Sequence, residues 1–334
     1  MAPPMQLPAA QLADAGDGSR GAPKGRPQHP ALLAGYNVRP PWKVAGVDYA
    51  VGYPKGTALT DWESLTGSGI SVNPSDHSVT LTGQSGATIS NVDFSLHGGA
   101  ILIIESSQNT TVTRCKFGGS SYKKILNAVI YADVYSPGLA VTYSVMDGGG
   151  KGLESTLVSV RAGGGTTTLE YNWFKNYSQH VIELVQDPGS AAFSVVYKYN
   201  LIERGAMTPL AHLNFLQFGS GTAGSVDVEH NTTYQVPEAS GGEGFQFYFN
   251  DPSGASMGNA VLARNTMIAT GGASGQAMSY VIHGGTVGTG TDDENYFDIT
   301  AAYGAYYPGS MTGAQGWTSS GNFNMVTGEA IAPQ

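Results

Sequence analysis

Three residues with chemically useful side chains, Glu105, Asp133 and Arg161, recur at one constant spacing in the chain. Each ends a short apolar segment rich in β-branched residues, which is typical of a strand. If these strands stack in successive coils, the side chains form a column with about 4.8 Å between neighbours. Two carboxylates one strand apart lie near the roughly 5 to 5.5 Å separation of retaining glycosidases. The adjacent arginine could hold a substrate carboxylate or lower the pKa values of the two acids.

Other residues could extend this column into a larger surface. Either Glu183 or Gln186 continues it, depending on strand register, and a pair two strands apart, such as Asp133 and Glu183, approaches the upper end of the inverting range. Glu183 therefore joins the first three residues as a catalytic candidate. An outward-facing tyrosine would offer a flat platform for a sugar ring. The candidate substrate-binding residues are Tyr131, Gln186, Gln217, Tyr248, Asn250 and His283.

A simpler explanation of the column needs no chemistry. Exposed polar residues are the default on the outer face of a sheet, and like charges one strand apart could be screened by salt or bridged by a calcium ion. We expect no other cofactor. The seven histidines are scattered rather than set at ligand spacing, so the sequence predicts no histidine-based metal site.

The elements that would position these residues are revealed by a repeat of asparagines. An asparagine recurs about every 30 residues, each time after a β-prone segment, and a repeat of this length is typical of a solenoid. In a solenoid each unit buries its apolar face by stacking on its neighbours. Stacked amides could bond one another and the turn backbone, and Asn also tolerates a left-handed turn conformation. The six are Asn172, Asn200, Asn231, Asn265, Asn295 and Asn322, with Ser144, Cys115 and Val92 in the same position of earlier repeats.

The composition agrees with a single β-solenoid domain. Glycine, at 47 of 334 residues, is about twice its usual share, and charged residues, at 12%, are about half theirs. Cys115 is the only cysteine, so no internal disulfide can form, and we interpret it as a buried filler. The sequence predicts an all-β solenoid of about nine coils with an internal asparagine ladder, and the family resemblance described below implies a single-stranded right-handed parallel β-helix.

The N-terminal part differs in composition from the repeats. We expect residues 1–35, rich in Pro and Gly, to be an extended tether, residues 36–80 to cap the first coil, and residues 81–334 to form the β-helix. The segment 1–30 contains no apolar core of a standard secretion signal. No membrane span is predicted, and a net charge of -9 without a basic stripe argues against nucleic acid as a partner.

The repeat, the asparagine ladder and the strand rhythm resemble the right-handed parallel β-helix of the pectate-lyase-like superfamily, which includes phage tailspikes, over roughly residues 80–325. The resemblance implies that the outer face of the first sheet is the working surface, and that an arginine there could be the base of a lyase. The fold alone assigns no reaction.

Three functions remain open. The first is a tailspike-like, extracellular or virion-associated protein that binds a polysaccharide or cell-surface glycan, for which the resemblance implies a homotrimer. The second is a polysaccharide lyase or glycoside hydrolase that uses the Glu/Asp/Arg column. The third is a purely structural appendage or decoration protein.

Overall fold

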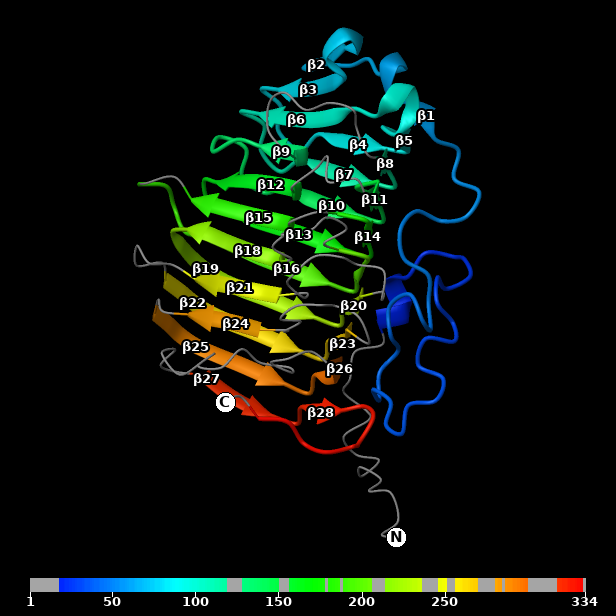
Figure 1. Cartoon of the computed structure of the whole chain (residues 1–334). Helices are drawn as coiled ribbons and strands as arrows, with labels where there is room; N and C mark the ends of the chain where they lie inside the picture. Colours follow the sequence, from blue (N-terminus) through cyan, green and yellow to red (C-terminus); the bar gives the residue numbers. More distant parts are fainter. Residues whose placement is uncertain are drawn as a thin grey trace.

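The computed structural model describes residues 18–118, 128–149, 156–177, 180–186, 189–205, 214–235, 246–250, 256–269, 280–283, 286–299 and 317–332. These residues form a solenoid of three parallel sheets, stacked coil upon coil along one axis (Figure 1). The only helical elements among them are four short 3-10 turns, η2 (Gly18–Gly21), η3 (Trp62–Ser64), η4 (Pro74–Asp76) and η5 (Leu96–Gly98). The predicted fold class, an all-β right-handed parallel β-helix, is confirmed.

Each coil contributes one strand in turn to each of the three sheets. The first sheet contains β2 (Ile70–Asn73), β3 (Ser78–Thr82), β6 (Ile101–Glu105), β9 (Ala128–Ala132), β12 (Thr156–Ala162), β15 (His180–Gln186), β18 (Asn214–Ser220), β21 (Gln246–Asn250) and β24 (Tyr280–His283). The second sheet contains β4 (Thr88–Ser90), β7 (Thr111–Thr113), β10 (Ala140–Thr142), β13 (Thr166–Glu170), β16 (Phe193–Lys198), β19 (Thr222–Glu229), β22 (Ser256–Ala263), β25 (Thr286–Asp293) and β27 (Trp317–Ser320). The third sheet contains β1 (Thr60–Asp61), β5 (Val92–Asp93), β8 (Lys116–Gly118), β11 (Val145–Asp147), β14 (Trp173–Lys175), β17 (Leu201–Glu203), β20 (Thr232–Gln235), β23 (Thr266–Ala269), β26 (Tyr296–Ile299) and β28 (Phe323–Asn324).

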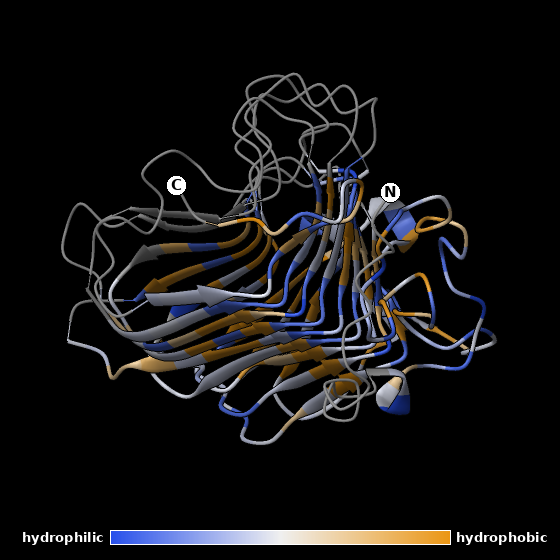
Figure 2. Ribbon diagram, turned by 90° about the horizontal axis from the view of Figure 1, so that it is seen from below, coloured by the Kyte–Doolittle hydropathy of each residue, from blue (hydrophilic) through white to orange (hydrophobic). Residues whose placement is uncertain are grey.

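The core runs along the axis of the solenoid, and many of the described strands contribute alternate residues to it. In β16, for example, Phe193, Val195 and Tyr197 are buried whereas the residues between them are partly exposed. The same alternation in the neighbouring strands aligns like residues coil above coil, and Phe94 stacks on Phe117 with ring centroids 4.6 Å apart. Apolar bands therefore follow the strands through successive coils (Figure 2).

The predicted asparagine ladder occupies the corner between the second and third sheets. The backbone N–H of Asn172 and its side-chain amide both donate to Oδ1 of Asn200, at 2.9 and 3.1 Å. The same pair of bonds links each asparagine to the next as far as Asn322. Ser144 and Cys115 continue the ladder toward the first coil, because the Cys115 N–H donates to Ser144 Oγ and the Ser144 N–H donates to Asn172. Cys115 is fully buried, and burial raises its pKa to about 11, as expected of a filler.

The left-handed residue at this corner is the one before each ladder position, not the asparagine itself. Tyr171, Tyr199 and His230 all have a φ between 57° and 59°. The expectation that the asparagines themselves adopt the left-handed conformation is therefore wrong, and their role in the repeat is to form the ladder of hydrogen bonds. The left-handed turn directs the preceding side chains outward, where Tyr143, Tyr171, Tyr199 and His230 stack on one another at centroid distances of 4.9 to 5.2 Å.

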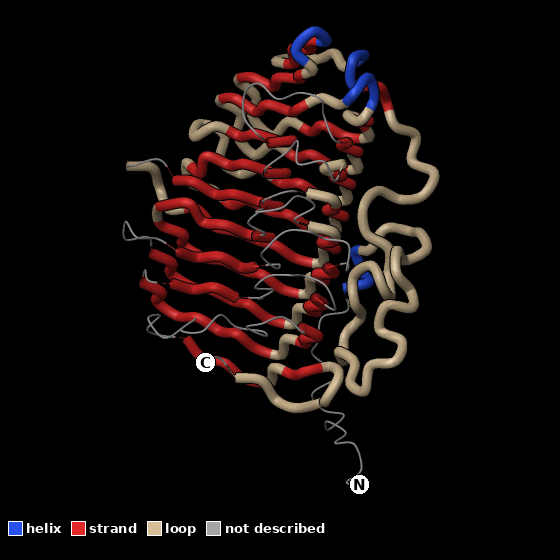
Figure 3. The backbone as a smooth tube through the Cα atoms, viewed as in Figure 1, coloured by secondary structure: helices blue, strands red, loops and turns tan. Residues whose placement is uncertain are grey.

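Residues 18–59, which we call the strap, lie along the outside of this aromatic stack and of the third sheet (Figures 1 and 3). The strap first runs toward the last coil, where the Val38 N–H donates to the carbonyl of Met325. It then returns, and Trp42 lies edge-on to the ring of His230 and Tyr49 to that of Tyr171. Leu33, Trp42, Val44, Val47, Ile268, Tyr296 and Met325 form a second apolar cluster between the strap and the coils.

This arrangement differs from the extended tether and the cap that the composition suggested. The described part of the tether lies against the coils, because its apolar side chains are buried there. Residues 36–59 of the predicted cap belong to the strap, whereas residues 60–82 lie at the end of the solenoid, where β2 pairs antiparallel with β3 and the buried Trp62 donates from Nε1 to the carbonyl of Leu96. The division of the chain into domains stays a prediction.

Candidate functional site

The outer face of the first sheet carries two parallel columns of residues. The pairs Ile104–Ala132 and Ala132–Val160 place Glu105, Asp133 and Arg161, one position further on, in line. The constant spacing in the sequence thus gives the expected register. Two positions before them, a second column contains Ile103, Tyr131, Ser159, Glu183, Gln217 and Tyr248.

The structure corrects how the first column continues. Arg161 pairs with Val185, so neither Glu183 nor Gln186 follows it. The connection from the ladder to the first sheet is shorter between Asn172 and Glu183 than between Ser144 and Ser159, and this shortening moves Glu183 into the second column. The prediction that Asp133 and Glu183 lie in one column, as the acid pair of an inverting enzyme, is therefore wrong.

Asp133 is occupied by the turn that follows β9. Its carboxylate accepts hydrogen bonds from the N–H of Ser106 at 3.1 and 3.2 Å, from the N–H of Tyr135 at 3.1 Å and from Ser136 Oγ at 2.6 Å. These bonds tie two consecutive coils together at their turns. A carboxylate whose lone pairs are so engaged is suited to holding the turn and poorly suited to attacking a substrate or taking a proton from it.

Glu183 is the catalytic candidate that lies in the second column, and its side chain is partly buried. Burial raises its pKa, and the positive charge of Arg161 acts in the opposite direction. The two side chains thus interact across the two columns. An acid and a guanidinium at this place can hydrogen-bond to hydroxyl or carboxylate groups of a ligand lying on the sheet.

The remaining predicted binding residues differ in their positions. Gln217 accepts a hydrogen bond from Asn214 Nδ2 at 2.7 Å and lies beside Glu183. Gln186 pairs with Ala162 and therefore lies off both columns. Its side chain donates to the carbonyls of Ser190 and Ala191 and accepts from the N–H of Thr222. For Tyr248, Asn250 and His283 the structure gives the backbone position only, and Asn250 pairs with His283.

Tyr135 is a candidate that the sequence analysis missed. Its side chain is 69% exposed, the highest value among the exposed large apolar and aromatic residues of the described chain. It follows Asp133 closely in the turn, and its N–H donates to that carboxylate, so the backbone of Tyr135 is held next to the first column. It lies outside the repeating strands, where periodicity carries no signal. An exposed tyrosine in a turn was the only available sign.

No metal centre is formed within the described segments. Among those residues no three His, Cys, Asp or Glu side chains come close enough together to hold an ion. Glu105 and Asp133 therefore have no third acidic partner there, and the predicted calcium bridge remains untested.

Comparison with other proteins adds no relative to this picture. No protein-family model matches the chain, and comparisons with curated proteins and with solved structures likewise find no match. In the part of the chain that the structure describes, no helix is long and apolar enough to cross a membrane.

Proposed function

We propose that this protein binds a polysaccharide or cell-surface glycan along the outer face of its first sheet. The observation that carries the proposal is the position of Tyr135, an exposed aromatic residue whose backbone is held by Asp133, the middle residue of the column of Glu105, Asp133 and Arg161. Sugar recognition commonly combines an aromatic surface for the C–H face of the ring with charged and amide groups for its hydroxyls.

Binding is preferred to catalysis because of the state of the carboxylates. The carboxylate of Asp133 accepts hydrogen bonds from Ser106, Tyr135 and Ser136. Glu183 lies in the second column, so it is not in line with Asp133 as the predicted acid pair requires. The lyase or hydrolase alternative is thus second. Release of reducing ends or unsaturated sugars from a panel of bacterial and plant polysaccharides would establish it.

The finer resemblance belongs to the same proposal. Coils of three strands, one in each sheet, and a buried asparagine ladder support membership in the pectate-lyase-like superfamily, with tailspikes as the favoured relatives. On this basis we place the protein outside the cell or on a virion and expect a homotrimer. Co-sedimentation with phage particles tests the first statement, and sedimentation equilibrium tests the second.

The decisive experiment is a glycan array followed by affinity electrophoresis with variants. Tyr135→Ala and Arg161→Gln should each weaken binding of the selected glycan at least fivefold. Leu96→Ala, which truncates an exposed side chain in the η5 turn, is the matched control and should bind as the unchanged protein does. An array without any ligand would favour the structural-appendage alternative. Full binding by Tyr135→Ala would show that the glycan does not contact Tyr135 and would remove the observation on which the proposed site rests.

A further inference from the structure

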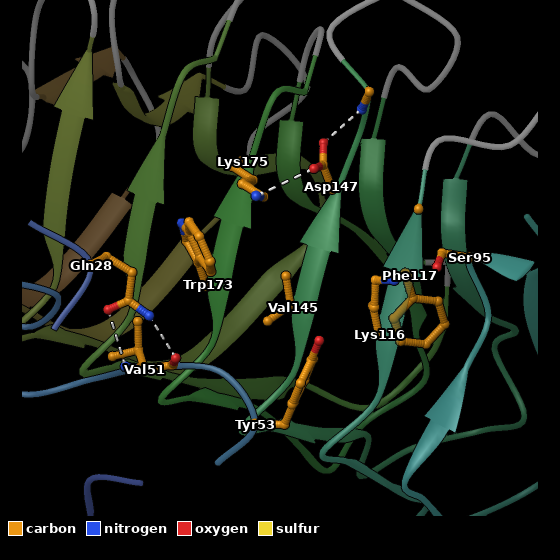
Figure 4. A pocket seen from close by; sticks show the side chains of 12 residues that line it. Gln28, Val51, Tyr53, Ser95, Lys116, Phe117, Val145, Asp147, Trp173 and Lys175 are labelled. Carbon is orange, nitrogen blue, oxygen red and sulfur yellow. Dashed lines mark hydrogen bonds and ion pairs between the residues drawn. The ribbon is translucent and has the colours of Figure 1, made fainter. Parts of the chain in front are cut away.

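A cavity of about 530 Å³ lies between the strap and the outer face of the third sheet (Figure 4). Gln28, Val51 and Tyr53 of the strap form one side of it. Gln28 is fixed there, because its amide donates to the carbonyl of Val51 at 2.8 Å. The volume lies within the range of roughly 300 to 1,000 Å³ that is usual for small-molecule sites.

The floor of the cavity is an ordered surface of three neighbouring strands, β8, β11 and β14. Lys116, Val145 and Trp173 pair in register and form one row. Asp147 and Lys175 lie in the next row, two positions further along their strands. The floor thus has an apolar centre, Val145 and Trp173, with an ammonium group at two opposite corners.

The strap itself explains why the sheet is open here. In the following coil the two rows continue with Leu201 and Glu203, which are 0% and 4% exposed. Gly46 of the strap lies against Leu201, and His29 binds Glu203, so both positions are closed. Trp173 and Lys175 remain only partly buried. The cavity is therefore the place where the strap leaves the third sheet uncovered.

Hydrogen-bond donors dominate the polar part of the lining. Asp147 Oδ1 already accepts from the Gly149 N–H at 2.9 Å and from Asn176 Nδ2 at 2.8 Å, and Oδ2 lies 3.4 Å from Lys175 Nζ. Each lysine makes one ion pair within the described segments, Lys116 with Asp93 at 3.3 Å and Lys175 with Asp147. An ammonium group has three N–H donors, so donor capacity remains on both lysines.

We infer that this cavity binds an acidic sugar unit, with its carboxylate at the Lys175 ammonium group and the C–H face of its ring on Val145 and Trp173. A donor-rich lining requires an acceptor-rich ligand, and a carboxylate forms the stronger, charge-assisted bonds to ammonium. Lys175 Nζ lies 4.0 Å from the centroid of the Trp173 ring, so charge and ring are held together on the same side of the floor. The site is separate from the first-sheet surface and does not depend on the glycan binding proposed there.

Titration with sodium glucuronate, followed by calorimetry and by tryptophan fluorescence, tests this assignment. Glucuronate should bind saturably and at least tenfold more tightly than glucose, and its binding should weaken as salt rises. Lys175→Met keeps the apolar stem but removes the charge, and it should weaken binding at least fivefold. Lys24→Met removes an exposed lysine of the strap outside the cavity and is the matched control.

Three results would overturn the inference. They are the absence of saturable glucuronate binding, equal binding of glucose, and unchanged binding by a Lys175→Met variant with an unchanged melting temperature. Tyr135→Ala separates the two proposals, because it should leave glucuronate binding intact. If Tyr135→Ala abolishes that binding, the acidic sugar lies on the first sheet, and the cavity assignment fails while the proposed function stands.

Discussion

Asn200 donates both its backbone N–H and its side-chain amide to a single oxygen, Oδ1 of Asn231, each at 3.0 Å. Its second amide hydrogen goes to the carbonyl of Leu169 at 2.9 Å. All of these groups are buried, and the bonds join three coils. The ladder therefore satisfies polar groups that the corner between two sheets would otherwise leave without partners.

Asn200→Ala should lower the free energy of unfolding by about 2 to 4 kcal/mol, because it leaves several buried donors and acceptors unsatisfied at once. Urea denaturation followed by circular dichroism measures the change. Cys115→Ser is the control at the same ladder position, where Ser144 already shows that a hydroxyl fits, and it should cost less than about 1 kcal/mol. Equal effects of the two substitutions would contradict the role given to the amide.

The ladder and the first column could be predicted because both are periodic. A strand that returns at a constant interval fixes the relation of Glu105 to Asp133 without any knowledge of the loops between them. Glu183 could not be placed in the same way, since its position depends on the length of one irregular connection. Because that connection is shorter, Glu183 lies in the second column and not in the first.

The strap and the cavity could not be predicted at all. Trp42 and His230 lie far apart in the chain, and nothing periodic links them. The segment 1–59 is rich in Pro and Gly, which indicates an irregular backbone. This composition does not distinguish a segment that extends into solvent from one that packs on the coils. Only the large apolar side chains Leu33, Trp42 and Tyr49 indicated packing, and they do not specify a surface.

His230 should make the fold sensitive to acid. Burial lowers its pKa from 6.5 to about 4, with Arg264 and Lys198 acting in the same direction and Glu229 against them. Between those two pH values the unfolded chain binds a proton that the folded chain does not. The stability from this residue is therefore complete above pH 6.5 and is lost as the pH falls toward 4, by about 3 kcal/mol.

Urea denaturation of His230→Phe between pH 4 and 7 tests this expectation. Phenylalanine keeps an aromatic ring between Tyr199 and Trp42 but cannot titrate, so the variant should lose this part of the pH dependence. His97→Phe replaces an exposed histidine in the η5 turn and serves as the comparison. The same acid sensitivity in His230→Phe as in the unchanged protein would refute the assignment.

Asp227 should have the opposite effect over nearly the same range. Burial and a hydrogen bond with Glu229 raise its pKa from 3.8 to about 6, although Lys198 counteracts them. Between pH 3.8 and about 6 the folded chain holds a proton that the unfolded chain has released, so the stability contributed by this carboxyl falls as the pH rises. Because Asp227 and His230 oppose each other, the unchanged protein should show a shallow pH profile in this window.

The Asp227→Asn variant reveals the contribution of that carboxyl. Its free energy of unfolding should rise more steeply between pH 4 and 6 than that of the unchanged protein, with a difference of roughly 1 kcal/mol after allowance for solvent screening. Glu63→Gln, which neutralises an exposed acid in η3, is the control for the loss of one charge. Parallel profiles for Asp227→Asn and the unchanged protein would show that Asp227 is ionised throughout.

His29 should be a main attachment of the strap to the coils. Its Nε2 binds the carboxylate of Glu203, which is only 4% exposed, and its ring lies edge-on to Tyr234 at 5.3 Å.

His29→Ala leaves a buried carboxylate without this partner, and hydration of Glu203 then requires the strap to move away. Limited trypsin digestion should cut His29→Ala after Lys24 and Lys43, two exposed lysines of the strap, several-fold faster than the unchanged protein, with little change in the melting temperature of the solenoid. His97→Ala removes a histidine–aspartate pair at the covered end of the solenoid, so its strap should be cut at the original rate. If both variants are cut at that rate, the apolar cluster around Trp42 holds the strap without the help of His29.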